Sequence, residues 1–389
     1  MKKNILIVGP YLPGKAFGGP VKSLVNITET LNEKYNFFVL TGDRDLNSTT
    51  PYGNVELEAW NKVGNAEVLY TTKKKSFKHI LKLLRSEKYD LVYLNSFFSF
   101  NSIVIQVLKL LKLTNKPILL APRGEFSPGA LEIKSSKKKI YFFLYKLLKL
   151  KKNVTFTSNV EKDKRYIKET LGDDVKVHVA NNIALNKQNF EIIKPYKKRG
   201  EIKIVTVSRI VTIKNLDYTL KILKDIDNTN KEFNSIIFDI YGPIEDVEYW
   251  EMCKSIIKTM SSKINVVYKG PLEYEEVIQT LSKYHLFILP TQGENFGHVI
   301  QEALLAACPV IISDQTPWIQ LKDKNVGYDI PLKNNLAFIN AINNISEMNN
   351  KEFSFLSKSA FEYGKDCITN QESIKNHEFM FEEVIERKR

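Results

Sequence analysis

The stretch Leu286–Asp314, LFILPTQGENFGHVIQEALLAACPVIISD, carries the pattern that decides the fold. Its two ends, Leu286–Pro290 and Pro309–Ser313, are apolar runs typical of buried strands. Between them Gly297 closes a loop, and His298–Ala307 has the composition of a helix. The proline of the second run ends that helix because it lacks an N–H donor. The stretch therefore predicts one strand–loop–helix–strand unit of a parallel sheet.

Two carboxylates, Glu294 and Glu302, flank the entrance of that helix. The first N–H groups of a helix have no internal partner and the helix dipole adds positive charge there, so this entrance favours a phosphate. Glu302 lies roughly 7–8 Å beyond Gly297 at about 1.5 Å per residue. Carboxylates beside a phosphate site accept hydrogen bonds from pairs of hydroxyls, which a nucleotide sugar offers in its hexose and ribose. Two ordinary glutamates on a solvated helix are the alternative, and the turn, the strands and the apolar helix face favour the ligand site.

Composition indicates a globular protein with room for two domains. The chain has 389 residues, of which 43% are hydrophobic and 26% charged. Cys253, Cys308 and Cys367 have no disulfide or metal-ligand spacing, which indicates buried thiols in a reducing compartment. The apolar run Ile5–Val8 is too short for a signal peptide, and no stretch reaches the roughly 20 apolar residues of a membrane span. We therefore expect a cytoplasmic protein.

The net charge of +13 comes entirely from the first half of the chain. Residues 1–185 hold 31 Lys and Arg against 16 Asp and Glu, whereas the remainder holds 26 against 28. The segment Lys134–Lys152 has eight lysines, no acid, and aromatic and leucine side chains between them. It predicts either a basic amphipathic helix on an anionic membrane surface or an ordinary helix with its aromatics packed inward, and the sequence leaves both open. Its clustered aromatics disfavour nucleic-acid binding.

Short apolar strands alternate with helical segments along the whole chain, which predicts an α/β fold of two doubly wound domains. The expected strands are Asn4–Gly9, Phe37–Gly42, Asp90–Asn95, Pro117–Pro122, Asn153–Ser158, Lys176–Ala180, Lys203–Ser208, Ser235–Gly242, Ile264–Gly270, Leu286–Thr291 and Pro309–Asp314. We expect domains at residues 1–185 and 201–374, and a polar linker at 186–200. A charged C-terminal helix is expected at 375–389, with packing back onto the first domain as one option.

In such sheets ligands bind beyond the carboxyl ends of the strands, so the residues that follow the strands are candidates. Gly18 and Gly19 precede a helix after the first strand, where the backbone can approach an anion closely. The motif is not GxGxxG, which disfavours a nicotinamide site. Arg209 and Lys214 follow the first strand of the second half, and two cations there would neutralise a departing diphosphate.

Five motifs together resemble a family 4 retaining glycosyltransferase of the GT-B fold, a group 1 glycosyl transferase. They are FGGP at Phe17–Pro20, SRIVTIKNLD at Ser208–Asp217, IYGP at Ile240–Pro243, YKGPL at Tyr268–Leu272 and ENFGHVIQE at Glu294–Glu302. Their order matches over most of the chain, and the second half is the more specific. The resemblance implies two Rossmann-like domains that face a cleft.

The resemblance also implies roles for the side chains that match. Glu294 would contact the hydroxyls of the donor sugar, and Glu302 would hold the ribose hydroxyls. Arg209 and Lys214 would bind the diphosphate. The transfer would proceed with retention, by attack on the same face while the departing diphosphate assists deprotonation. The acids are therefore expected to position the donor, unlike the acid pair of a glycosidase.

Further donor contacts implied by the resemblance come from backbone groups. They are Gly18, Gly19, Gly270, Leu272, Asn295, Phe296 and Gly297, with the base near Lys269–Leu272. The family is typically independent of metal, so no cofactor besides the nucleotide-sugar substrate is expected. The sequence Asp43-Arg44-Asp45 looks like a metal-binding DxD motif, but we interpret it as a turn because no third oxygen ligand is evident.

The chain departs from the family at one place. Many relatives carry a histidine after a strand in the middle of the first domain, where this chain has Ala121–Glu125, without histidine. Arg123 and Glu125 are therefore the candidates for the acceptor side, and a structural ion pair is the alternative for Arg123. His298, inside the donor motif, is expected to make a helix-end contact.

The leading hypothesis is transfer of a hexosyl group from a nucleotide-diphosphate sugar to a glycan or lipid-linked acceptor in surface polysaccharide synthesis, at the inner membrane face. A nucleotide-sugar epimerase on the same fold is the alternative within the fold, and it would need no acceptor. A non-catalytic basic module that binds lipid or nucleic acid is the third hypothesis. This hypothesis does not explain why Arg209, Lys214, Glu294 and Glu302 occur together in one chain.

Overall fold

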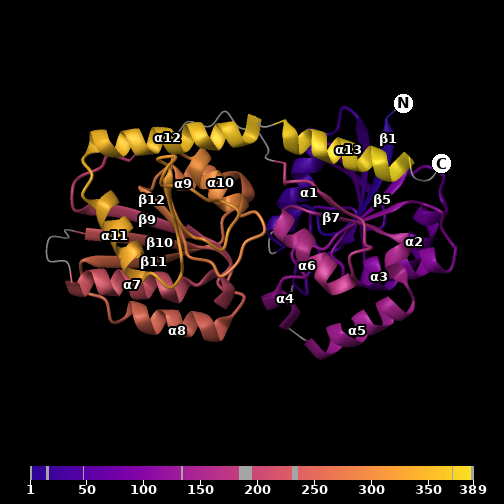
Figure 1. Cartoon of the computed structure of the whole chain (residues 1–389), viewed down its shortest axis with the longest axis horizontal. Helices are drawn as coiled ribbons and strands as arrows, with labels where there is room; N and C mark the ends of the chain where they lie inside the picture. Colours follow the sequence, from indigo (N-terminus) through magenta and orange to yellow (C-terminus); the bar gives the residue numbers. More distant parts are fainter. Residues whose placement is uncertain are drawn as a thin grey trace. The chain divides into compact units, whose positions relative to one another are not determined.

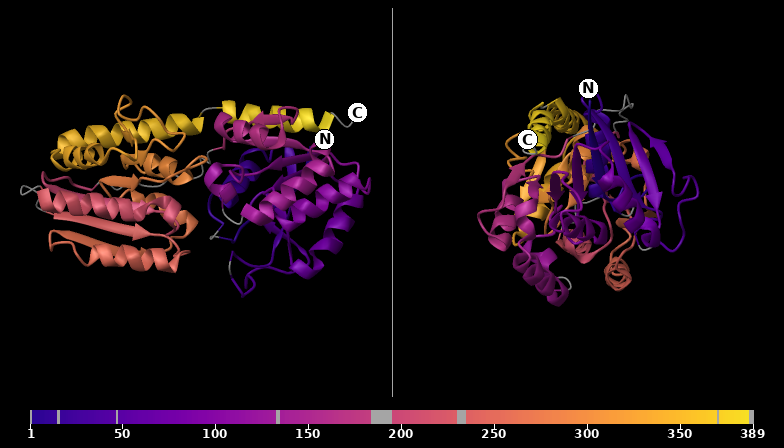
Figure 2. Two further views of the ribbon diagram at one scale, coloured as in Figure 1. Left: turned by 60° about the horizontal axis from the view of Figure 1, so that its bottom comes forward. Right: turned by 90° about the vertical axis from the view of Figure 1, so that its right-hand side faces the viewer.

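The computed structural model describes residues 2–14, 17–46, 48–132, 135–183, 195–229, 235–369 and 371–386. Lys134 and most of the expected linker, residues 186–194, lie outside the described residues. The chain divides into two compact units, Met1–Leu185 with Asn370–Arg389 and Asn186–Thr369. Each unit holds one sheet with helices on its two faces, as Figure 1 and Figure 2 show.

The sheet of the first unit has eight strands in the order β3-β4-β2-β1-β5-β6-β7-β8. They are β1 (Lys3–Val8), β2 (Tyr35–Gly42), β3 (Trp60–Val63), β4 (Ala66–Thr71), β5 (Leu91–Asn95), β6 (Ile118–Ala121), β7 (Thr155–Ser158) and β8 (Val177–Val179). All neighbours are parallel except β3 and β4, which form an antiparallel pair at the edge.

The helices of the first unit are α1 (Gly19–Thr30), α2 (Lys73–Arg85), α3 (Phe100–Leu110), α4 (Pro128–Glu132), α5 (Ser135–Leu147), α6 (Glu161–Leu171), α13 (Glu372–Glu386) and the 3-10 turn η1 (Leu150–Asn153). Alternate residues of β1 enter different cores, since successive side chains of a strand point to opposite faces. Leu6 and Val8 pack in the core under α2, α3 and α6, and Ile5 and Ile7 in the core under α1. The segment from Asn370 belongs to this unit, and Phe381 of α13 is buried in the second of these cores.

The sheet of the second unit has six parallel strands in the order β11-β10-β9-β12-β13-β14. They are β9 (Glu201–Val207), β10 (Ser235–Tyr241), β11 (Ile264–Gly270), β12 (Leu286–Leu289), β13 (Val310–Ser313) and β14 (Gly327–Ile330). The helices are α7 (Leu216–Thr229), α8 (Val247–Ile257), α9 (Val277–Leu281), α10 (His298–Leu305), α11 (Asn335–Ser346) and α12 (Asn350–Thr369), with 3-10 turns η2 (Thr212–Lys214) and η3 (Tyr274–Glu276).

The opening stretch forms β12, α10 and β13 at the centre of this sheet. The four residues of β12 are completely buried, and they alternate between the core with α7, α8 and α11 and the core with α9, α10 and α12. Burial on both faces explains why the run is apolar without alternation. Burial also fixes the position of β12, so that its carboxyl end lies at the carboxyl end of the sheet, where the loop to α10 begins.

All eleven expected strands are present, with ends shifted by a residue or two. Three strands were not expected, namely β3, β4 and β14. The hairpin of β3 and β4 lies at the outer edge of its sheet, and β14 is a four-residue edge strand. The edge strands β3 and β14 have a partner on one side only, and edge strands carry more polar residues. This does not explain β4, which pairs with both β3 and β2.

Candidate functional site

The carboxyl ends of β9 and β12 are held together by hydrogen bonds to backbone carbonyls. The N–H of Gln292 donates to the carbonyl of Ile213 over 2.8 Å, and the Thr291 hydroxyl donates to the same carbonyl over 3.1 Å. The side-chain amide of Asn215 donates to the carbonyl of Pro290 over 3.0 Å. The turn after β9 and the loop after β12 therefore form one surface at the edge of the sheet.

These contacts bring Lys214 and Glu294 together. The Lys214 ammonium forms an ion pair with the Glu294 carboxylate, although the two residues are 80 positions apart. The side chains keep only 14% and 15% of their accessible surface. The N–H of Glu294 also donates to the carbonyl of Gln315 over 3.1 Å, which ties its loop to the end of β13.

Arg209 lies at the same edge and is oriented by an acid that the sequence did not indicate. Its Nη1 donates to Glu245 Oε2 over 2.9 Å and to Oε1 over 3.2 Å. Glu245 follows the IYGP turn, which packs directly on the backbone before Arg209. At Gly242 a Cβ would lie 1.8 Å from the Ser208 carbonyl oxygen, and the φ of +138° also favours glycine. Close backbone packing thus places the guanidinium beside the strand ends.

The loop before α10 is shaped by Gly297 and Phe296. Gly297 has a left-handed φ of +76° and caps α10, and a Cβ there would lie 2.7 Å from the Ile300 side chain. The indole N–H of Trp318 donates to the carbonyl of Phe296 over 2.5 Å. The rings of Phe296 and His298 lie 4.8 Å apart. Asn295, Phe296 and Gly297 therefore present their backbone beside the start of α10, next to Glu294.

Glu302 lies on α10 and is half-buried. Burial raises the pKa of the Tyr274 hydroxyl, and the nearby Glu302 charge raises it further. Gly270 has a φ of +83° with no atom within 4 Å of a Cβ built on it, so the end of β11 is open. Leu272 is partly buried against the core of α9 and α10. The second unit thus holds Glu302 on α10 and Gly270 and Leu272 at the carboxyl end of β11.

The expected glycines of the first unit start α1. Gly18 has φ +59° and ψ −125°, a conformation that only glycine adopts readily, and no atom lies within 4 Å of a Cβ built on it. Gly19 is the first residue of α1, and Pro20 follows in its first turn.

In the DxD-like turn, Arg44 donates to both oxygens of Asp43 over 2.9 and 2.7 Å and lowers the pKa of that carboxyl.

Arg123 joins the carboxyl ends of several strands in the first unit. Its Nε and Nη2 donate to Asn95 Oδ1 over 3.0 and 2.8 Å, and Nη2 also donates to the Tyr93 hydroxyl over 3.1 Å. Its Nη1 donates to the side-chain oxygens of Asn159 and Asn182, each over 3.3 Å. These hydrogen bonds go to neutral groups, so they hold the guanidinium without neutralising its charge.

Glu125 has a buried, local role in the structure. Ser96 Oγ donates to its Oε1 over 2.6 Å, and the N–H of Phe97 donates to its Oε2 over 2.5 Å. Ser96 has a φ of +98°, which is uncommon for a residue other than glycine. Burial raises the pKa of the Glu125 carboxyl, while these donors lower it. The carboxylate thus stabilises the strained turn after β5.

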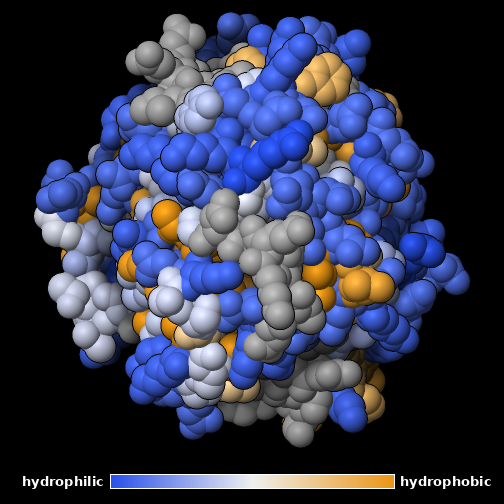
Figure 3. Space-filling view, turned by 90° about the vertical axis from the view of Figure 1, so that its left-hand side faces the viewer, coloured by the Kyte–Doolittle hydropathy of each residue, from blue (hydrophilic) through white to orange (hydrophobic). Residues whose placement is uncertain are grey.

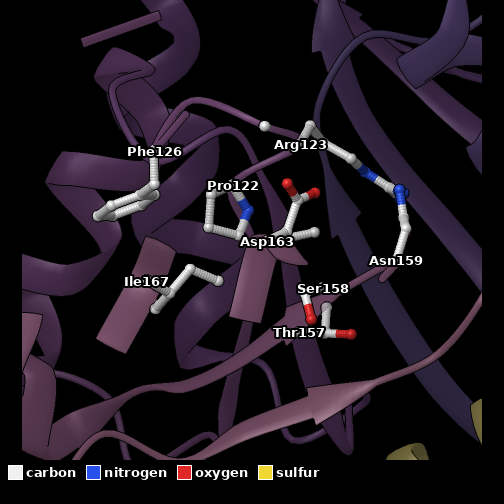
Figure 4. Close-up of a pocket in the computed structure, with 10 residues that line it drawn as sticks. Pro122, Arg123, Phe126, Thr157, Ser158, Asn159, Asp163 and Ile167 are labelled. Carbon is white, nitrogen blue, oxygen red and sulfur yellow. The ribbon is translucent and has the colours of Figure 1, made fainter. Parts of the chain in front are cut away.

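A small pocket lies beside Arg123 at the ends of β6 and β7, and Figure 4 shows its lining. The Asp163 carboxylate points toward Pro122 and the backbone of Arg123, whereas the Arg123 side chain extends toward Asn159. Asp163 keeps only 9% of its accessible surface, and burial raises its pKa to about 6. A carboxyl with this pKa can exchange a proton near neutral pH. The sequence did not indicate Asp163, because it lies within a helix and not directly after a strand.

The second unit matches a known family. The family model described as "Glycosyl transferases group 1" matches residues 187–360. The match lies within the second unit, and the fold of the whole chain comes from its two Rossmann-like sheets and from the solved structures below, which show a GT-B fold.

Two curated relatives are similar to parts of the chain. An uncharacterized 41.2 kDa protein in the cps region of Klebsiella pneumoniae is 27% identical over 60% of this chain and 63% of its own length. The GtfA subunit of a UDP-N-acetylglucosamine–peptide N-acetylglucosaminyltransferase from Streptococcus pneumoniae is 28% identical over 34% of this chain and 25% of its own. The matches thus span less than two thirds of either relative.

Solved structures share the fold over nearly the whole chain. Sucrose-phosphate synthase from Thermosynechococcus elongatus gives a TM-score of 0.69 at 13% identity, covering 99% of this chain and all of that one. Anabaena HepE in complex with UDP and glucose gives 0.65 at 15% identity, covering 98% and 99%. At these identities the likeness shows the fold.

Proposed function

We propose that the protein is a retaining glycosyltransferase that moves a hexosyl group from a nucleotide-diphosphate sugar to a glycan or lipid-linked acceptor in surface polysaccharide synthesis. The observation that carries the proposal is the ion pair of Lys214 with Glu294 at the carboxyl ends of β9 and β12. The relative from the cps region and the structural neighbour HepE, which is bound to UDP, support the same proposed function.

In this proposal each group has a task. An ammonium has three donors, so Lys214 can keep Glu294 and still donate to a phosphate oxygen. Glu294 has further lone pairs for sugar hydroxyls, and Arg209, held by Glu245, supplies a second cation for the diphosphate. The N–H groups at the start of α10 complete the anion site, and Glu302 lies further along that helix for the ribose.

In the proposed reaction an acceptor hydroxyl oxygen bonds to the anomeric carbon on the face from which the diphosphate leaves. The bond between that carbon and the diphosphate oxygen breaks, and the hydroxyl proton passes to the departing diphosphate. Arg209 and Lys214 stabilise the charge that builds on the leaving group. No protein carboxylate has to form a bond to the sugar in this scheme, and no metal is required by it.

The test begins with a thermal-shift screen of UDP-, GDP- and dTDP-sugars. UDP-sugars are the first choice, because the names of similar proteins specify UDP. Release of nucleoside diphosphate is then measured with and without an acceptor. Release that depends on an acceptor supports transfer, whereas isomerisation of the donor without acceptor would establish the epimerase alternative.

Variants locate the activity on the proposed residues. We expect Arg209→Ala to lower kcat/KM by about 100-fold or more, because it removes a group that stabilises the charge on the leaving diphosphate. Glu294→Ala should lower kcat/KM by about 100-fold as well, because it removes the carboxylate that orients the donor sugar and the partner of Lys214. Lys254→Ala is the matched control, because Lys254 forms an exposed ion pair with Glu251 over 2.6 Å on α8. Full turnover in the Arg209 and Glu294 variants would rule out this site.

A further inference from the structure

Helix α5 and the residue after it expose an apolar face. Ile140, Phe143, Leu144, Leu147 and Leu148 keep 63%, 67%, 45%, 63% and 43% of their accessible surface. They recur at spacings of three and four residues, so they share one side of the helix. An apolar stripe on the outer side of a helix is not needed for the fold of its own domain.

Another side of α5 anchors the helix to the first unit. The rings of Tyr141, Phe142 and Tyr145 surround Phe97, with centroids 5.2, 5.7 and 4.8 Å from its ring. The Tyr145 hydroxyl donates to Gln106 Oε1 over 3.0 Å. The helix is therefore fixed by its aromatic side, and its exposed apolar side is held outward.

Lysines border the exposed face. The exposed ones are Lys139, Lys146, Lys149 and Lys152. Lys138 and Lys151 have partners within the unit, since Lys138 donates to the Ala130 carbonyl and Lys151 lies 2.6 Å from Asp174. No acid occurs between residues 134 and 152. The segment itself therefore combines apolar side chains with positive charge only.

We propose that α5 docks on an anionic lipid bilayer, with its exposed apolar side chains at the boundary of headgroups and acyl chains and its lysines among the headgroups. Both features of the face match this partner, because anionic lipids attract lysines and the acyl boundary accepts apolar side chains. The helix lies in the membrane plane. Within the described part of the chain, no helix is long and apolar enough to cross a bilayer.

One other face of the molecule gives a contrast. On the face shown in Figure 3 the surface is mostly hydrophilic, and its apolar side chains form small separate groups.

A second copy of the chain is the other possible occupant of the α5 face. Like charges on two facing copies would repel, because the segment carries lysines and no acid. The charge pattern thus favours lipid over self-association.

The docking face lies close to the pocket at the ends of β6 and β7. The Phe142 ring on the inner side of α5 is 5.7 Å from the ring of Phe126, which lines that pocket. Since a helix is about 10–12 Å across with its side chains, docking would hold the pocket roughly one helix diameter from the headgroups. A saccharide carried on a lipid would then reach the pocket, and this last step rests on the proposed function.

Vesicle flotation of the full chain tests the docking without donor or acceptor. We expect binding to vesicles of phosphatidylcholine mixed with phosphatidylglycerol, and little binding to phosphatidylcholine alone. Phe143→Ser with Leu147→Ser should weaken binding by about tenfold or more, since the stripe supplies the apolar part. Lys146→Glu with Lys149→Glu should weaken it by about tenfold or more through charge.

Matched controls test whether vesicle binding depends on the α5 face or on any exposed apolar or basic side chain. Phe355 and Leu336 of the second unit are each 65% exposed, so Phe355→Ser with Leu336→Ser should leave vesicle binding unchanged. Lys351→Glu should do the same. A Phe143→Trp variant should also show quenching by brominated lipids beyond that of the wild-type chain, which reports insertion.

Several results would overturn the proposal. One is equal binding to both vesicle types, and another is wild-type binding that survives the Phe143 and Leu147 changes. A third is a dimer in solution that these two changes dissociate while no vesicle binding is seen, which would assign the face to a second copy. Nucleotide binding and transfer to a soluble acceptor are measured on the same variants, so failure of docking stays distinct from failure of the transferase proposal.

Discussion

Replacing Glu294 by alanine should leave the Lys214 ammonium without its partner. Both side chains keep only about one seventh of their accessible surface, at 14% and 15%, so water can replace the lost carboxylate only in part. The ammonium then pays much of its desolvation cost without compensation. The second unit should lose stability, and the donor should lose the carboxylate that is proposed to hold its sugar.

The size of the expected loss of stability follows from the burial of these two side chains. Breaking a fully buried pair costs about 3–5 kcal/mol, and partial exposure lowers our expectation to about 2 kcal/mol. For a unit of this size that corresponds to a fall in Tm of roughly 4–8 °C. The reversed pair, Lys214→Glu with Glu294→Lys, should recover most of the stability. It would place a carboxylate where the diphosphate is proposed to bind, so we expect nucleotide affinity to remain about 100-fold below the wild-type value.

Differential scanning calorimetry measures the stability, and titration calorimetry with UDP or the donor found in the screen measures the affinity. The exposed pair of Glu251 and Lys254 serves as the control, and its double-mutant cycle should give a coupling near zero. A reversed pair that restores both stability and donor affinity would show a purely structural ion pair. An unchanged Tm in Glu294→Ala would show that the pair does not form in solution.

Three further outcomes can be measured. Burial lowers the pKa of His285 to about 4, and its Nδ1 accepts a backbone N–H bond over 3.0 Å, so the unfolded chain takes up the proton first. The free energy of unfolding should therefore be highest above pH 6.5 and fall by up to about 3 kcal/mol toward pH 4. In the His285→Phe variant, thermal melts at different pH values should show a smaller fall. Gly242→Ala should lower stability by about 3 kcal/mol and weaken nucleotide binding, because its Cβ would press on the Ser208 carbonyl. Arg123→Gln should reduce transfer while nucleotide affinity, measured by calorimetry, stays near the wild-type value; a fall in affinity alone would contradict the acceptor-side assignment.

The strands of both sheets could be predicted because central parallel strands are buried on both faces. The run Leu286–Leu289 has no polar residue, and its neighbour Val310–Ser313 has one only at its end. The edge strand Gly327–Ile330 has no such signature, since it pairs on one side only and carries Asp329. Burial on two faces therefore explains why the central runs were recognised, although it does not explain why β4, which is also buried, was missed.

The sequence singled out many residues of the candidate site, but not the contacts between them. Lys214 and Glu294 were recognised separately, and their ion pair depends on the register of β9 with β12, in which Ile204 pairs with Leu286. Glu245 had no motif, because its role depends on how the turn at Gly242 packs on the next strand end. Contacts that arise from sheet register are not written in local sequence spacing.

Helix α5 shows a different reason why the sequence was insufficient. The run Ile140–Leu148 is apolar around most of the helix, so its periodicity could not distinguish inward packing from a membrane face. The structure has an inward side and an exposed apolar side, because Tyr141 and Tyr145 turn inward while Phe143 and Leu147 remain exposed. Helical spacing decides which side chains turn inward, because positions 141, 142 and 145 face Phe97 and positions 143 and 147 lie on the other side. Inward packing therefore describes one side of the helix, and membrane docking is our proposal for the other.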